Sequence, residues 1–204
     1  MSEKASLSYN GKNYEFPVIT GTENESAIEI GKLRAQSGLV TFDEGYRNTG
    51  STVSNITFLD GELGILRYRG YNIEDLAEKA SFLEVSYLLL YGELPNTTQM
   101  ADFEKQITAH TLVHDNLVKV FEVFPTGSHP MGQLMTMISA LSSFYPDSLN
   151  PNTNPEQTNL TIIRLLAKMP TICSMIQKKG KGHPVLYPQN KYDYVTNFLY
   201  MTFG

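Results

Sequence analysis

The chain has 204 residues, of which 41% are hydrophobic and 18% are charged, and its formal net charge is −5. These values are typical of a globular protein, and the scattered Lys and Arg residues exclude a basic surface for nucleic acid. No apolar run approaches the length of a membrane span, and residues 1–5 lack the apolar core of a secretory signal. The single cysteine, Cys173, excludes an internal disulfide, and four histidines with one cysteine show no zinc-ligand spacing. We therefore expect a protein of the reducing cytoplasm that binds no metal.

The first 46 residues predict β structure. Residues 6–17 alternate apolar and polar side chains around Asn10-Gly11, a pair that tolerates the positive φ angles of a type I′ turn, so they predict a hairpin. Residues 26–34 predict a short helix, and residues 38–46 predict an extended segment. So small a β-rich arm is expected to need a partner surface.

Residues 56–71 predict a second hairpin around an Asp60-Gly61 turn. Arg67 and Arg69 are two positions apart, so on an extended strand both guanidinium groups would point to one face. The residues alone indicate only a hairpin with two solvated arginines.

Helix signals follow from Asn72 onward. Glu74 and Asp75 suit the first turn of one helix, where negative charge favours the helix dipole. A capping box of Ser81 and Glu84 opens the next helix, residues 82–91, which is apolar nearly all round and is therefore expected to be buried nearly all round.

Three more helices are predicted over residues 97–109, 114–123 and 130–141, and Pro130 suits the first position of the last one. Helical spacing assigns its apolar side chains to the core; these are Met131, Leu134, Met135, Ile138 and Leu141, together with Met137. Residues 147–159 are rich in Asn and Pro and predict a surface loop.

Pro155 opens a further predicted helix, which Pro170 should break or kink because proline lacks a donor and clashes one turn back. The following turns are expected to end at Gly180. Residues 191–204 predict a last apolar helix with no capping signal of its own. The pattern as a whole predicts a mainly α fold with a β-rich arm over residues 1–71 and a helical part over residues 72–204.

No catalytic constellation, phosphate loop or dinucleotide fingerprint is present in the sequence. His110 and His114 are four residues apart and could share a helix face, but without a third ligand they are better interpreted as polar helix-end residues. His129 precedes Pro130 and is interpreted as a capping residue. His183 lies in a Lys- and Gly-rich run that is typical of a solvated loop.

An ordered series of sequence blocks resembles the citrate synthases, in particular the hexameric type of Gram-negative bacteria. The blocks are Thr41-Phe42-Asp43-Glu44-Gly45-Tyr46, residues 56–71, Tyr87-Leu88-Leu89-Leu90-Tyr91-Gly92-Glu93-Leu94-Pro95, Ser128-His129-Pro130-Met131, residues 164–171, Tyr187-Pro188 and Asn197-Phe198-Leu199. Because several blocks match in order, the resemblance is more specific than any single motif. It implies the multi-helical large domain of a citrate synthase with a small N-terminal β-rich arm.

The resemblance also implies an activity, the condensation of acetyl-CoA with oxaloacetate to citrate and CoA in the tricarboxylic acid cycle. In the family an aspartate removes a proton from the acetyl-CoA methyl group and two histidines act on the enol and the oxaloacetate carbonyl. None of the four histidines here matches a catalytic one, so we expect an N-terminal half that is inactive alone. The whole enzyme is expected to be a homo-oligomer, a dimer or a hexamer of dimers, and the half is expected to self-associate through exposed apolar surface.

In the hexameric type the resemblance further implies an allosteric NADH site. The matching residues are His110, Thr111, Tyr145, Arg164, Lys168 and Asn190, whose side chains suit phosphates, ribose and adenine. Two positions depart from the family pattern, since Ala109 replaces a basic residue and His183 replaces a glutamine. The alternative is that Arg164 and Lys168 belong to an ordinary helix surface.

Two other functions stay open at this point. A 2-methylcitrate synthase shares the fold and much of the signature. A helical interaction module without catalysis would carry the same elements. No resident cofactor is expected for any of the three.

Overall fold

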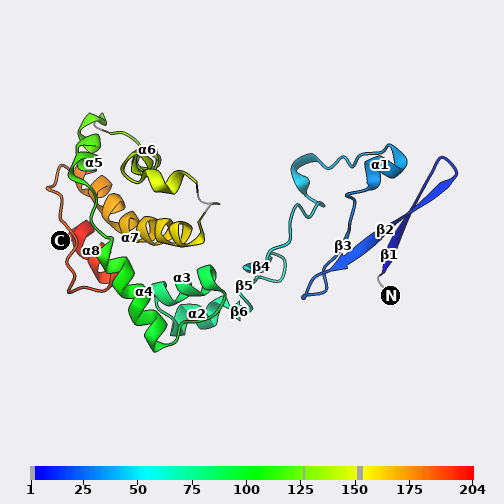
Figure 1. Ribbon diagram of the computed structural model, residues 1–204, viewed down its shortest axis with the longest axis horizontal. Helices are drawn as coiled ribbons and strands as arrows, with labels where there is room; N and C mark the ends of the chain where they lie inside the picture. The colour runs from blue at the N-terminus through cyan, green and yellow to red at the C-terminus, as the bar shows by residue number, and fades with distance from the viewer. Residues whose placement is uncertain (1–2, 126, 151–153) are drawn as a thin grey trace. The chain divides into compact units, whose positions relative to one another are not determined.

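A computed structural model describes residues 3–125, 127–150 and 154–204 and divides the chain into two compact units, residues 1–55 and 56–204 (Figure 1). The hairpin that contains residues 57–68 therefore belongs to the second unit, whereas the sequence placed it with the arm.

The first unit is built on a three-stranded antiparallel sheet with the order β1-β2-β3, formed by β1 (Lys4–Tyr9), β2 (Lys12–Thr20) and β3 (Ser26–Ile28). Asn10 and Gly11 join β1 to β2 with φ angles of 51° and 73°, as a type I′ turn requires. The predicted first hairpin is confirmed.

The helix predicted over residues 26–34 is wrong in its first part. Residues 26–28 pair with Val18–Thr20 of β2 and form β3, and the helix α1 (Leu33–Ser37) begins only afterwards. Residues 39–42 form no strand, and a 3₁₀ turn follows at Glu44–Tyr46. Phe16 and Leu33 are the apolar residues buried among residues 3–55, so this unit has a very small core.

The second unit opens with a small sheet of β4 (Thr57–Asp60), β5 (Ile65–Tyr68) and β6 (Tyr71–Asn72). The predicted hairpin is present, but its loop spans residues 61–64, and the Asp60 carboxylate accepts hydrogen bonds from the backbone N–H groups of Glu62 (3.0 Å) and Leu63 (2.9 Å).

The two arginines of this hairpin do not share one strand face. Arg69 lies beyond β5 with a φ of 50°, and its guanidinium donates to the carbonyl of Leu89, 2.9 Å away. Arg67 stays on β5 and donates to the side chain of Asn72 at 3.1 Å. The turn after β5 therefore redirects the second arginine toward the helices.

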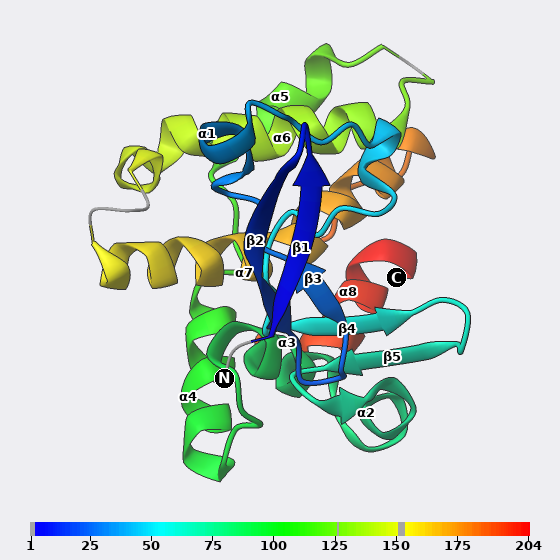
Figure 2. The same ribbon diagram turned by 90° about the vertical axis from the view of Figure 1, so that its right-hand side faces the viewer.

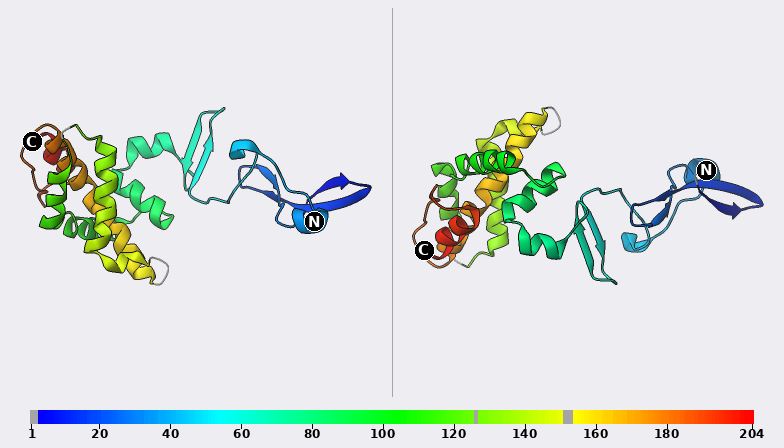
Figure 3. Two further views of the ribbon diagram at one scale, coloured as in Figure 1. Left: turned by 90° about the horizontal axis from the view of Figure 1, so that it is seen from above. Right: turned by 90° about the horizontal axis from the view of Figure 1, so that it is seen from below.

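Helices make up the rest of the second unit, as Figure 2 shows from one side and Figure 3 from above and below. They are α2 (Ile73–Lys79), α3 (Phe82–Tyr91), α4 (Thr97–Ala109), α5 (Asp115–Val120), α6 (Pro130–Phe144), α7 (Pro155–Gly180) and α8 (Tyr194–Phe203). Short 3₁₀ turns follow α5 at Phe121–Val123 and α6 at Pro146–Leu149. The mainly α fold is confirmed, and so is the capping box of Ser81 and Glu84.

Helix α7 is the central element of this unit. Its Ile163 and Ala167 pack in one core cluster with α3 and α4, and its Ile172 and Met175 pack in a second cluster with α5 and α6. By length and composition α7 could cross a membrane, with a mean hydropathy of 1.2 in its most apolar window, but half of that window is buried inside the protein. We interpret α7 as a core helix, whose apolar composition follows from contact with neighbours on several sides.

Pro170 does not break α7, which continues through it from Pro155 to Gly180. A proline leaves the carbonyl four residues earlier without its usual donor, and here that carbonyl belongs to Leu166. The hydroxyl of Tyr194 donates to it at 2.9 Å. Tyr194 therefore replaces the missing backbone hydrogen bond and ties the start of α8 to α7.

Two predicted apolar faces are only partly buried. On α3, Phe82 is 53% exposed although Leu83 and Leu88 are buried. On α6, Met131 and Met135 are 55% and 69% exposed, whereas Met137 is fully buried. The core assignment of Met131 and Met135 is wrong because α6 packs on α7 through the face that carries Met137.

Two predictions near the end of the chain also need correction. The side chain of Asp193 accepts a hydrogen bond from the backbone N–H of Thr196 at 2.8 Å, so α8 does have a cap. The predicted loop 147–159 is shorter, because α7 already begins at Pro155. Residues 151–153 of that loop lie outside the described part of the chain.

Candidate functional site

The linker between α4 and α5 is held on α7 by two side chains. The ammonium of Lys168 donates to the carbonyls of His110 (2.6 Å) and Leu112 (2.5 Å), and the hydroxyl of Thr171 donates to the carbonyl of Thr111 (2.8 Å). Because Lys168 and Thr171 are three residues apart, they lie on one face of α7. Three successive backbone carbonyls thus find donors on a single helix.

Lys168 is 3% exposed although its side chain carries a formal charge. Burial, with a smaller contribution from the nearby Arg164, lowers its pKa from 10.5 to about 8. The two carbonyls compensate for the water that the ammonium loses on burial. The ring of Tyr145 contributes as well, because its centroid lies 5.4 Å from the Lys168 nitrogen.

The guanidinium of Arg164 lies over the same Tyr145 ring, at 4.6 Å from its centroid. Its Nε and Nη1 atoms are buried and have no hydrogen-bond partner in the described part of the chain. Buried donors of this kind are rare in folded proteins. Arg164 is therefore the member of the group with hydrogen-bonding capacity that the described residues do not use.

His110 ends α4 and lies beside these cations. Burial lowers its pKa first, and the positive charges of Lys168 and Arg164 lower it further. Both effects favour the neutral form of the imidazole. We call His110, Tyr145, Arg164 and Lys168 the basic cluster.

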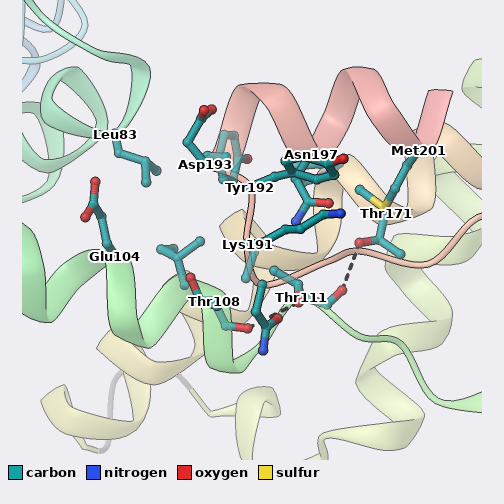
Figure 4. Close-up of a pocket in the computed structure, with 15 residues that line it drawn as sticks. Leu83, Glu104, Thr108, Thr111, Thr171, Lys191, Tyr192, Asp193, Asn197 and Met201 are labelled. Atoms are coloured by element: carbon teal, nitrogen blue, oxygen red, sulfur yellow. Dashed lines mark hydrogen bonds between the residues drawn. The ribbon is translucent and has the colours of Figure 1, made fainter. Parts of the chain in front are cut away.

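A cavity of about 270 Å³ lies among α4, α7, α8 and the segment before α8 (Figure 4). Its floor is apolar and buried, and is formed by Leu83, Ile107, Ala167, Pro170 and Met201. Its polar lining includes Glu104, Thr108, Asn190, Lys191 and Asp193.

The six residues predicted from the resemblance fall into two neighbouring groups. Four of them form the basic cluster, while Thr111 and Asn190 line the cavity. Thr111 connects the two groups. Its carbonyl accepts a hydrogen bond from Thr171, and the carbonyls of the residues before and after it, His110 and Leu112, accept hydrogen bonds from Lys168.

Sequence reasoning missed Thr171, Glu104 and Lys191. For Thr171 a signal existed, because it follows Lys168 by three residues on a predicted helix. Glu104 and Lys191 carried no local signal, because they come from segments that meet only in the folded chain.

Two of the remaining histidines, His114 and His129, have structural roles. The Nδ1 atoms of His114 and His129 accept hydrogen bonds from the backbone N–H groups of Asn116 (3.0 Å) and Met131 (3.2 Å), so both cap helices, as predicted for His129. His110 and His114 lie at the ends of different helices and do not share a face. Within the described residues no group of three potential metal ligands occurs.

A family model described as "Citrate synthase, C-terminal domain" matches residues 45–204, which include the basic cluster and the cavity. The chain belongs to the citrate synthase family. It is 48% identical over 202 residues to "Citrate synthase 1" of Mycobacterium tuberculosis, a match that covers 99% of this chain and 47% of that protein. The chain thus spans about half the length of the curated citrate synthases that it matches.

Solved citrate synthase structures share the fold. The citrate synthase of Pyrobaculum aerophilum superposes with a TM-score of 0.71 at 29% identity, covering 93% of this chain and 45% of that one. The enzyme of Thermotoga maritima gives a TM-score of 0.68 at 27% identity, with coverage of 80% and 42%. These matches confirm the multi-helical citrate synthase fold implied by the sequence blocks.

Proposed function

We propose that this chain is part of a citrate synthase that condenses acetyl-CoA with oxaloacetate to citrate and CoA, as a step of the tricarboxylic acid cycle. The observation that carries the proposal is the 48% identity to a citrate synthase over 99% of the chain. The experiment is a coupled assay of CoA release by the intact protein with both substrates. Release that requires both acetyl-CoA and oxaloacetate supports the proposal.

The same assay tests the alternatives. A 2-methylcitrate synthase would prefer propionyl-CoA to acetyl-CoA, and an interaction module would release no CoA from either. The proposal of citrate synthase therefore fails if propionyl-CoA is the better substrate or if neither thioester is consumed.

We propose that the 204 residues alone do not catalyse this reaction. His110, His114 and His129 lie at helix ends, and the latter two use Nδ1 for capping. The chain matches only 47% of the length of its relative. Turnover by the purified 204-residue chain, after its folding has been checked by circular dichroism, would contradict this proposal.

We propose that the intact protein resembles the hexameric type and binds NADH at the basic cluster. Support comes from the buried, unpartnered N–H groups of Arg164 beside Tyr145. Lys168 already donates to two carbonyls, so Arg164 supplies the direct phosphate contact in this proposal. Ala109 gives the site one positive charge fewer than the family pattern, and His183 places an imidazole where the family has a neutral glutamine.

Calorimetry with NADH tests this site in the intact protein. Arg164→Met removes a charged hydrogen bond of about 1.5–3 kcal/mol and should weaken NADH binding by about 10- to 100-fold. Arg47→Met, at an exposed arginine in the first unit, is the matched control and should bind normally. No heat with the unaltered protein, or equal binding by both variants, would contradict the proposal.

We also propose that the protein forms a homo-oligomer, a dimer or a hexamer of dimers, in the cytoplasm. The exposed Met131 and Met135 on α6 support association, and the single cysteine suits a reducing compartment. Sedimentation and cell fractionation test the two parts separately.

A further inference from the structure

The cavity beside α8 is held open by hydrogen bonds within its walls. The side-chain amide of Asn197 accepts from the backbone N–H of Gln189 (3.0 Å) and donates to its carbonyl (3.1 Å), which fixes the segment before α8. Tyr194 ties the start of α8 to α7, and Thr171 ties α7 to the linker. A cavity with walls bonded in this way is pre-formed, as small-molecule sites usually are.

Charged groups are separated across this cavity. Glu104 and Asp193 lie on one side of it in Figure 4, while Lys191 reaches toward Thr171 on the other side. The Asp193 carboxylate is engaged by Thr196, but Glu104 has no hydrogen bond or ion pair within the described residues. The Lys191 ammonium lies 4.8 Å from the ring centroid of Tyr192. One side therefore offers a carboxylate and the other an ammonium, with an apolar floor between them.

We propose that this cavity binds a free α-amino acid with an apolar side chain. The ligand's ammonium would pair with Glu104, its carboxylate with Lys191, and its side chain would cover the floor near Met201. At about 270 Å³ the cavity is slightly smaller than the roughly 300–1,000 Å³ of drug-sized sites, so it suits a single amino acid rather than a dinucleotide. The cavity adjoins the basic cluster, because Thr111 and Asn190 of the six residues that the resemblance assigns to NADH line it. The proposal does not rest on the proposed catalysis.

Calorimetry of the intact protein with L-leucine tests the site. Two analogues share the leucine skeleton, 4-methylpentanoate without the ammonium and 3-methylbutylamine without the carboxylate. We expect saturable leucine binding and at least about tenfold weaker binding of each analogue, because each loses one charged contact. No saturable binding of L-leucine or L-phenylalanine, or equal binding of an analogue, would overturn the proposal.

Variants locate the binding within the fold. Glu104→Gln and Lys191→Met change exposed side chains and should weaken leucine binding by about tenfold or more without unfolding the protein. Glu122→Gln and Lys119→Met, at exposed positions away from the cavity lining, are the matched controls and should bind normally. Unchanged binding by both cavity variants would show that leucine binds elsewhere and would refute the assignment.

Discussion

At the scale of single residues, Lys168 is a buried cation that organises the backbone around it. Its ammonium bonds two carbonyls that are separated from it by more than 50 residues in sequence. From the sequence it was either an NADH ligand or part of an ordinary helix surface, and its 3% exposure excludes an ordinary surface. The hydrogen bonds show in addition that its main contacts are to the protein's own linker.

Lys168→Met should destabilise the protein. The change leaves the carbonyls of His110 and Leu112 without a donor, which is only partly offset by removing a buried charge, so we expect a loss of about 2–4 kcal/mol in the free energy of unfolding. Urea unfolding measures it. Lys119→Met at an exposed position should change stability by less than about 0.5 kcal/mol, and equal stability of the two variants would contradict the role of Lys168.

Lys168 should also make the stability of the protein depend on pH. Its pKa is about 8 in the folded protein and 10.5 in the reference state, so between these values the unfolded chain binds the proton and the folded chain does not. Stability should therefore rise with pH through this window by the linkage relation. The urea midpoint of the unaltered protein minus that of Lys168→Met should increase between pH 8 and pH 10, and a flat or falling difference would contradict the lowered pKa.

At the scale of elements, the junction of α7 and α8 depends on a proline and a tyrosine. Pro170 leaves the carbonyl of Leu166 without a backbone donor, and Tyr194 supplies one. Burial raises the pKa of Tyr194 to about 12, so its hydroxyl keeps the proton throughout the neutral range.

Tyr194→Phe should therefore cost about 1–3 kcal/mol of stability, because the Leu166 carbonyl is left without a partner. In a Pro170→Ala background the backbone N–H of residue 170 can donate to the Leu166 carbonyl. Tyr194→Phe should then lower the free energy of unfolding by clearly less. Urea unfolding of the four proteins of this double-mutant cycle gives the coupling, with Tyr187→Phe, an exposed tyrosine, as control. Additive effects would show that Tyr194 does not replace the proline's missing donor.

The helices that the sequence predicted correctly are those whose first residues carry a signal within one turn. The capping residues Ser81 and His129 mark helix starts through contacts within one turn, and Pro155 marks one by its place at the first helical position. These starts were correct. The errors arose where a distant partner decides the outcome. Residues 26–28 form a strand because β2 offers them an edge, and Pro170 stays within a helix because Tyr194 reaches it.

The candidate site shows the same division. The resemblance identified the four residues of the basic cluster, which the fold does bring together. It could not reveal that Lys168 bonds the linker, or that Glu104 and Lys191 share a cavity, because both facts depend on how α4, α7 and α8 pack.

At the scale of the whole molecule, the helical unit exposes apolar side chains that a partner surface would cover. Met131 and Met135 are one helical turn apart on α6 and are 55% and 69% exposed. If this face joins subunits, Met135→Lys should shift the intact protein toward smaller species by placing a charge in an apolar contact. Analytical ultracentrifugation measures the shift, and Lys119→Met controls for an unrelated surface change. An unchanged distribution would remove this face from the interface.

We propose that the chain belongs to an enzyme that joins acetyl-CoA to oxaloacetate. The basis of this proposal is the family match over residues 45–204 and the shared fold of solved citrate synthases. The most direct test is the initial rate of CoA release by the intact protein with acetyl-CoA, measured with and without oxaloacetate. We expect CoA release only when both substrates are present, and a lower rate with propionyl-CoA. Absence of release with both substrates, or a higher rate with propionyl-CoA, would contradict it.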